Sequence, residues 1–144
     1  MAVLQMVHDV EPADKLRSEV GTVDDIDVFN NQVLVAVYRR SNEATLGGKK
    51  FILTDQTTGE DRFQSKVGLI LKLGPDAFVD ETGKWFRGAN INVGDWVVFR
   101  SSDGWNLTIL PAGAVTHSKP DMGLCKLIDD TAIRGRIPHP DRVW

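Results

Sequence analysis

The chain has 144 residues and a mass of 16.0 kDa, which fits one domain with extensions. Hydrophobic residues make up 42% of the chain, enough for a packed core, and this excludes an intrinsically disordered protein. The formal net charge is −3 without any basic stripe, and no apolar run approaches the roughly 20 residues that cross a bilayer, so we expect neither nucleic acid nor a membrane as a partner.

The chain begins with an acidic arm, residues 1–30, in which one helix is predicted. Residues 1–32 carry seven acidic and two basic side chains. Residues 12–20 predict the helix, because Pro12 suits a first helical turn and Gly21 is a stop signal. The arm is either an attachment for a partner or a solvated segment.

After the arm, short apolar runs alternate with Gly, Pro and Asp turns, the pattern of an all-β sandwich or barrel. Residues 74–92 are predicted to form a roof-type hairpin or long excursion with its tip near residues 80–84. Pro138 and Pro140 end the regular structure, so residues 138–144 are expected to be a C-terminal tail. The predicted strands lie at residues 33–38, 67–73, 93–99, 105–109, 124–128 and 132–137.

The most informative segment is the long polar stretch between the first two strands, residues 39–64. It contains the run Gly47-Gly48-Lys49-Lys50-Phe51-Ile52-Leu53. The two glycines give the backbone freedom, and the apolar triplet is surrounded by polar residues and has no obvious core of its own. An apolar patch displayed on a loop usually marks a surface for a partner. The sequence therefore predicts a binding protein, with Gly47, Gly48, Phe51, Ile52 and Leu53 as the partner-binding residues.

No catalytic constellation is recognisable, so we expect no enzyme activity, no metal and no cofactor. The histidines His8, His117 and His139 lie in the arm, a loop and the tail, with no spacing that places two of them on one metal. Cys125 is the single cysteine and is expected to be a small buried hydrophobe. A lone cysteine forms no internal disulfide, and this favours a reducing cytoplasm.

The four tryptophans are candidates for the core or for contacts between copies of the chain. Trp96 and Trp105 lie in alternating strands and are expected in the core or at a subunit boundary. Trp85 belongs to the predicted hairpin, where an exposed aromatic residue suits a contact with a symmetry mate. Trp144 either docks onto a neighbouring chain or ends a disordered tail.

The order of these landmarks resembles the co-chaperonins of the GroES-like family, the small ring that caps a chaperonin. A first strand is followed by a polar loop with a glycine pair and an apolar triplet, then by a strand that ends in Gly74 before the roof. The run Val93-Gly94-Asp95-Trp96-Val97-Val98-Phe99 is similar to the family's turn into a hydrophobic strand. Residues 125–133 resemble the closing strand pair that joins adjacent subunits, which makes Ile128 and Ile133 candidates for that contact, together with Trp85 and Trp144.

The resemblance implies a small irregular β-barrel, residues 31–137, assembled into a homo-oligomeric ring. Residues 39–64 would be the mobile loop, and Phe51-Ile52-Leu53 would enter an apolar groove of the chaperonin large subunit in a nucleotide-dependent way. The arm and the tail have no counterpart in an ordinary cellular member, which indicates a divergent, bacteriophage-encoded protein acting in the host cytoplasm.

An alternative stays open at this point. The same barrel would also suit a bacteriophage virion structural protein, a capsid decoration or cement protein that binds the major capsid protein. Extensions that wrap neighbouring subunits add buried area without enlarging the core, as a shell protein requires.

Overall fold

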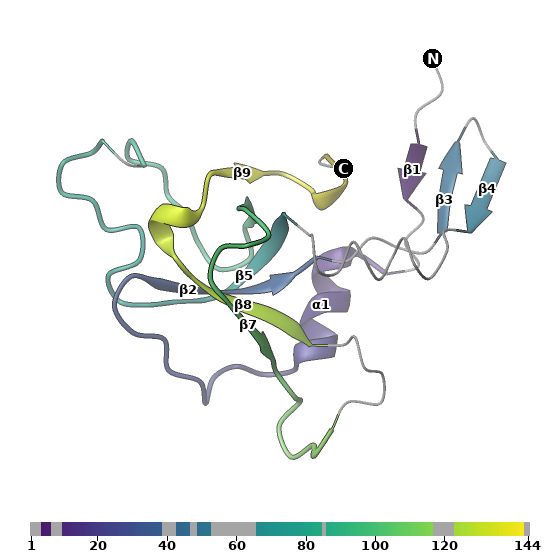
Figure 1. Cartoon of the computed structure of the whole chain (residues 1–144), viewed down its shortest axis with the longest axis horizontal. Helices are drawn as coiled ribbons and strands as arrows, with labels where there is room; N and C mark the ends of the chain where they lie inside the picture. The colour runs from purple at the N-terminus through teal and green to yellow at the C-terminus, as the bar shows by residue number, and fades with distance from the viewer. Residues whose placement is uncertain are drawn as a thin grey trace.

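The computed structural model describes residues 4–6, 10–38, 43–46, 49–52, 66–84, 86–116 and 123–142, with the backbone alone in the first, third and fourth of these segments. These residues are mostly β, with one short α-helix among them, α1 (Pro12–Val20), which the sequence predicted (Figure 1). Pro12 occupies its first turn and Gly21, with φ of +78°, follows its end. Among the described helices, none has the length and apolar content to span a bilayer.

Six strands form one antiparallel sheet. Its order is β7-β8-β2-β5-β6-β9, and each neighbouring pair is antiparallel. The order ends at β7 and β9, and closure of this sheet into a barrel stays a prediction. The strands are β2 (Gln32–Val37), β5 (Val67–Leu73), β6 (Trp96–Val98), β7 (Trp105–Thr108), β8 (Leu124–Asp129) and β9 (Gly135–Ile137).

Three further strands form a separate small sheet, and one of them, β1, comes from the N-terminal arm. Its order is β1-β3-β4, with β1 (Leu4–Met6), β3 (Glu43–Leu46) and β4 (Lys49–Ile52) all antiparallel. Figure 1 shows this small sheet to one side of the six-stranded sheet, beyond α1, with β4 as its outermost strand.

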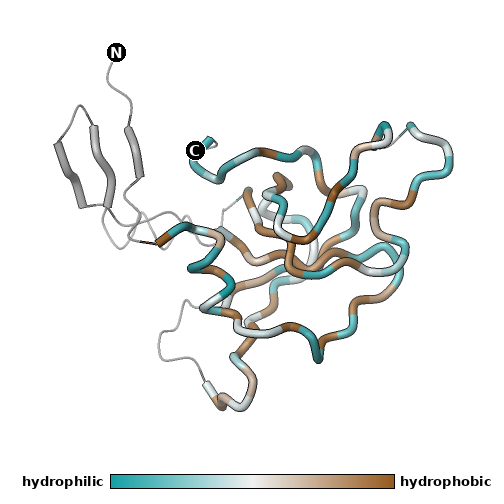
Figure 2. Tube along the Cα trace, turned by 180° about the vertical axis from the view of Figure 1, so that it is seen from behind, coloured by the Kyte–Doolittle hydropathy of each residue, from teal (hydrophilic) through white to brown (hydrophobic). Residues whose placement is uncertain are grey.

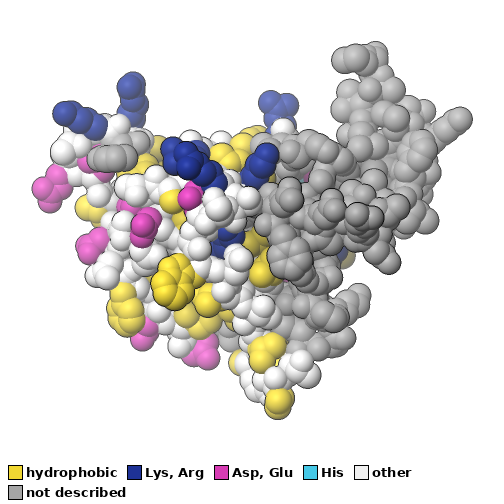
Figure 3. All heavy atoms as spheres, viewed as in Figure 1, with side chains coloured by type: hydrophobic (Ala, Val, Ile, Leu, Met, Phe, Trp, Pro, Cys, Tyr) yellow, Lys and Arg dark blue, Asp and Glu magenta, His cyan; other side chains and the backbone are white. Residues whose placement is uncertain are grey.

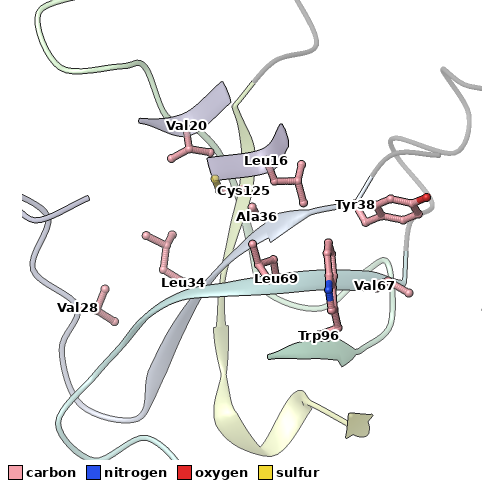
Figure 4. Close-up of a cluster of buried hydrophobic side chains, with 10 residues drawn as sticks. All are labelled: Leu16, Val20, Val28, Leu34, Ala36, Tyr38, Val67, Leu69, Trp96 and Cys125. Atoms are coloured by element: carbon pink, nitrogen blue, oxygen red, sulfur yellow. The ribbon is translucent and has the colours of Figure 1, made fainter. Parts of the chain in front are cut away.

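Both faces of the central strands are buried. On one face, Leu16 and Val20 of α1 pack over Leu34, Ala36 and their neighbours (Figure 4). On the other face lies a second cluster of Val33, Val35, Ile70, Val97, Phe99 and Ile128. Burial on both faces explains why β2 is an unbroken apolar run and lacks the apolar–polar alternation of a half-exposed strand. Figure 2 shows hydrophobic residues along the segments of the trace that cross in the middle of the molecule.

Residues 74–92 were predicted to form a hairpin or a long excursion. The described residues of this excursion, 74–84 and 86–92, run as turns and bends, and no strand is assigned among them. Asp130 explains how it is held: its carboxylate accepts a 2.9 Å hydrogen bond from the backbone N–H of Phe78 and another of 2.9 Å from Asn31 Nδ2. Phe78 has a φ of +60°, and its ring meets that of Phe86 edge to face. The excursion is therefore anchored at its base by a side chain.

The final predicted strand, residues 132–137, is shorter than expected. Asp130–Ala132 forms a 3-10 turn, which the hydrogen bond from the Ile133 N–H to Asp130 O closes. The backbone N–H of Asp130 donates to Asn31 O and so joins this turn to the residue before β2. Pairing with β6 begins only at Arg134, whose N–H donates to Val98 O. A second 3-10 turn, Pro140–Arg142, follows β9.

Candidate partner-binding site

Part of the segment predicted to be a mobile loop forms two paired strands, β3 and β4. Leu46 of β3 pairs with Lys49 of β4, so two residues separate the strands. Those two residues are Gly47 and Gly48, which lie outside the described residues, as does Leu53. A Gly-Gly pair between two strands is a typical signal for a two-residue hairpin turn. The Gly-Gly pair is therefore a sequence signal for this hairpin as well as a source of backbone freedom.

The strand assignment divides the apolar triplet between two faces. Phe51 pairs with Ala44, and Ile52 pairs with Glu43. Because successive residues of a strand belong to opposite faces, Phe51 and Ile52 lie on opposite faces of the small sheet. The two residues therefore do not form one flat contact, and a partner that engages both must surround β4 or meet its edge.

The register makes one face of the small sheet more apolar than the other. The positions that share a face with Phe51 pair across the three strands, and they include two from the N-terminal arm. They are Leu4, Met6, Ala44 and Leu46, with Lys49 at the end of the row. The opposite face carries Gln5, Thr45 and Lys50, next to the pair of Glu43 and Ile52.

The segment leaves and re-enters the main sheet at a well-packed root. The backbone N–H of Tyr38 donates to Val67 O at 2.9 Å. This hydrogen bond joins the two ends of the segment between β2 and β5. The Tyr38 ring packs edge to face on Trp96 with centroids 5.7 Å apart, and both residues are buried. Tyr38 also donates its hydroxyl to Asp141 Oδ1 at 2.8 Å.

A group of polar side chains from both ends of the chain surrounds this root. His139 lies between two carboxylates, with Nε2 3.9 Å from Glu11 Oε2 and Nδ1 3.7 Å from Asp141 Oδ2. The backbone N–H of Asp141 donates to His139 Nδ1 at 3.2 Å. The residue before α1 and the segment after β9 therefore meet beside the strand that leads into residues 39–64.

The candidates for contacts between subunits fall in different environments. Ile128 is fully buried in the second core cluster, so its side chain belongs to the interior of this chain. Ile133 is half-buried against the same cluster. Trp85 and Trp144 lie outside the described residues.

The two remaining tryptophans, Trp96 and Trp105, differ in their exposure to solvent. Trp96 is in the core, while Trp105 is 77% exposed. Trp105 and Leu107 pair with Leu127 and Cys125, so they continue the α1-covered face of the sheet onto its edge strand β7. Leu107 is 39% exposed as well, and Figure 3 shows hydrophobic side chains on the surface of this view. Periodicity alone did not reveal this exposure, because it depends on how far α1 reaches across the sheet.

Two buried side chains with reactive groups, Cys125 and Lys126, have structural roles. Burial, with a smaller contribution from Glu19, raises the pKa of the Cys125 thiol to about 12. Lys126 is 4% exposed, and burial lowers its pKa while Asp103 acts in the opposite sense. Its Nζ donates to the backbone carbonyls of Ser101 and Asp103, the latter at 2.6 Å, and lies 5.5 Å from the Phe99 ring centroid. Lys126 thus pins the turn that leads into β7.

No metal centre is found in the part of the chain that the structure describes. No group of three or more His, Cys, Asp or Glu residues there is arranged to hold a metal ion. An open pocket of about 350 Å³ lies between β6 and β9, but its two charged residues pair with each other, Arg136 Nη1 being 3.3 Å from Asp95 Oδ2. Arg136 also donates to Asn90 O at 2.7 Å, which ties the excursion to the sheet edge.

Comparisons of the chain with models of protein families, with curated proteins and with solved structures found no match.

Proposed function

We propose that this protein is a co-chaperonin that binds a chaperonin ring through the β3–β4 hairpin and closes its folding chamber. The observation that carries the proposal is the position of β4. This strand contains Phe51 and Ile52 and, among the described residues, pairs with β3 alone. It lies on the side of the small sheet farthest from the main sheet (Figure 1). A sheet edge with apolar residues that is left open is a surface suited to a partner.

Support also comes from the scaffold below the hairpin. Two buried clusters flank the six-stranded sheet. The two ends of the segment between β2 and β5 are joined by the hydrogen bond between Tyr38 and Val67. A rigid base of this kind holds a binding element at a fixed place. Several copies of the chain in a ring could then bind one chaperonin ring at the same time. The contact of each hairpin with the chaperonin is weak enough to dissociate. Tethering in one ring raises the effective concentration of the other hairpins and so strengthens the binding of the whole ring.

A ring of copies is part of the proposal, and the edge strand β7 supports it. Its sequence, Trp-Asn-Leu-Thr, contains neither a charged residue nor proline, which are the usual protections of an edge strand. Trp105 and Leu107 extend an apolar face there that α1 does not cover. We propose that a second copy of the chain covers this edge.

The experiment is a binding assay with purified chaperonin rings, with and without nucleotide, combined with sedimentation of the protein alone. The proposal requires an oligomer and nucleotide-dependent capture by the ring. Single variants Phe51→Ser and Ile52→Ser then identify which face of β4 the partner meets. A monomer that binds no ring under any nucleotide condition would contradict the proposal.

The second candidate is a virion structural protein that attaches to a capsid, and the placement of β1 favours it. The N-terminal strand pairs with a segment about 40 residues away in the sequence, at a distance from the main sheet. An arm that forms strand pairs at the periphery is suited to linking neighbouring subunits of a shell. Stoichiometric recovery in purified particles would favour this candidate over the first, provided that deletion of residues 1–9 reduces it. This deletion removes β1 and keeps α1, whose Leu16 and Val20 belong to the core.

A further inference from the structure

The N-terminal strand β1 occupies the inner edge of the candidate binding hairpin. Leu4 pairs with Leu46 and Met6 with Ala44, so β3 has a strand partner on each side. The outer edge of β4 is left without a strand partner among the described residues. The arm therefore touches the hairpin at the strand that does not carry Phe51.

A two-stranded hairpin of this size needs help to persist. Each of its strands has four residues, and an isolated two-stranded hairpin is at best marginally stable in water. A third strand adds cross-strand pairs and satisfies backbone groups along β3. Here the third strand also adds two apolar positions, Leu4 and Met6, to the face that contains Phe51.

We propose that β1 is a brace that keeps β3–β4 in its strand form before any partner arrives. The consequence for binding rests on the proposed function of the hairpin. A segment that orders only on binding loses affinity through the entropy of ordering, whereas a preformed segment does not. Apparent affinity scales with the fraction of molecules in the competent form, so a brace that maintains this fraction strengthens every contact the hairpin makes.

The first test measures the brace in the free protein, without any partner. Proline at both positions, Gln5→Pro with Met6→Pro, removes two successive backbone N–H groups, one of which must point toward β3. The matched control, Gln5→Thr with Met6→Val, keeps residues that favour strands. The measurement is amide hydrogen exchange of residues 43–46 and 49–52, with the amides of β2, β5 and β8 as an internal check that the main sheet is intact.

We expect the proline variant to lose protection at least tenfold in β3 and β4 while the main sheet exchanges as in the wild type. The control variant should match the wild type at all these amides. Unchanged protection of β3 and β4 in the proline variant would overturn the brace, and so would an equal loss in the control variant.

The second test separates the brace from the proposed partner. If the competent fraction falls to about one tenth, the dissociation constant for the chaperonin ring rises about tenfold. Lost protection with unchanged affinity would overturn the role of β1 in binding while leaving the co-chaperonin proposal intact. If the wild type binds no ring, the co-chaperonin proposal fails, and the exchange result alone decides whether β1 braces the hairpin.

Discussion

The hydroxyl of Tyr38 donates a 2.8 Å hydrogen bond to Oδ1 of Asp141, two residues that are 103 positions apart in the sequence. Tyr38 follows β2 at the point where the chain leaves for residues 39–64, and Asp141 lies in the 3-10 turn after β9. This bond fastens the C-terminal segment to the root of the candidate binding element. The chain's end therefore contributes to the base from which the hairpin extends.

Removing this hydroxyl tests that link. Tyr38→Phe keeps the edge-to-face contact with Trp96 and deletes only the O–H donor. We expect a loss of about 1 kcal/mol in the free energy of unfolding, the usual net contribution of one hydrogen bond. Urea denaturation followed by tryptophan fluorescence measures it, with faster exchange of the His139, Asp141 and Arg142 amides as the local sign. Asp141→Asn, which keeps an acceptor oxygen, should lose less; equal stability and exchange in Tyr38→Phe and the wild type would contradict the link.

A second prediction concerns Asp130, whose carboxylate is 4% exposed and joins Asn31 to Phe78. Asp130→Ala leaves a buried N–H at Phe78 and the Asn31 amide without this acceptor. Loss of such bonds should lower the free energy of unfolding by about 3 kcal/mol, because hydrogen bonds to charged groups contribute more than neutral ones.

The control for this prediction is Asn31→Ala, which removes only one of the two bonds and should lose roughly half as much. Amide exchange at Phe78 is expected to rise sharply in Asp130→Ala and to change little in Asn31→Ala. If Asp130→Ala unfolds at the same urea concentration as the wild type, the excursion 74–92 is not anchored in this way.

A third prediction follows from the raised pKa of Cys125, about 12 against an ordinary value of 9.0. The unfolded chain loses the thiol proton first as the pH rises, so the stabilisation is complete below pH 9 and is lost progressively toward pH 12. Between pH 8 and pH 10 the free energy of unfolding should fall by about 1.4 kcal/mol relative to Cys125→Ala.

The comparison with Cys125→Ala is needed because Lys126 titrates in the opposite sense. Burial lowers its pKa, so the folded state holds fewer protons on this lysine than the unfolded state and gains stability as the pH rises. Denaturation curves at several pH values supply the difference. Parallel pH profiles for the wild type and Cys125→Ala would contradict the burial of the thiol, as would rapid labelling of Cys125 in the native protein.

A fourth prediction addresses the edge strand β7. Trp105→Ser should leave the free energy of unfolding within about 0.5 kcal/mol of the wild type, as expected for an exposed residue, while shifting sedimentation toward the monomer. Val79→Ser is the matched control, since Val79 is 62% exposed and lies in the excursion away from β7. An unchanged oligomer in Trp105→Ser would show that β7 is not the covered edge.

Much of the fold was predictable because its signals are local. Pro12 and Gly21 mark the ends of α1. The apolar runs of β2 and β5 predict strands whatever their position in the sheet. Gly74 ends β5 for a reason the structure makes clear: a Cβ there would lie 2.4 Å from the carbonyl oxygen of Asn30. A side chain at this position would force the backbone apart.

What the sequence did not reveal depends on distant partners. Leu4 to Met6 is too short to stand out as a strand, and it becomes one only by pairing with residues 44–46. Asp130 lies in a turn, and nothing local in the sequence indicates that its carboxylate reaches Phe78 across the fold. The division of Phe51 and Ile52 between two faces follows from the strand assignment, which the Gly47-Gly48 signal could have suggested.

The measurement that most directly tests the central claim uses the triple variant Phe51→Ser, Ile52→Ser and Leu53→Ser in the chaperonin binding assay. Its matched control is Lys49→Ser with Lys50→Ser, which alters the same strand and keeps its apolar residues. We predict that the triple variant unfolds cooperatively at nearly the wild-type urea concentration yet loses binding, while the control variant keeps it. A triple variant that binds as tightly as the wild type, or that fails to fold, would contradict the claim that these residues are displayed for a partner.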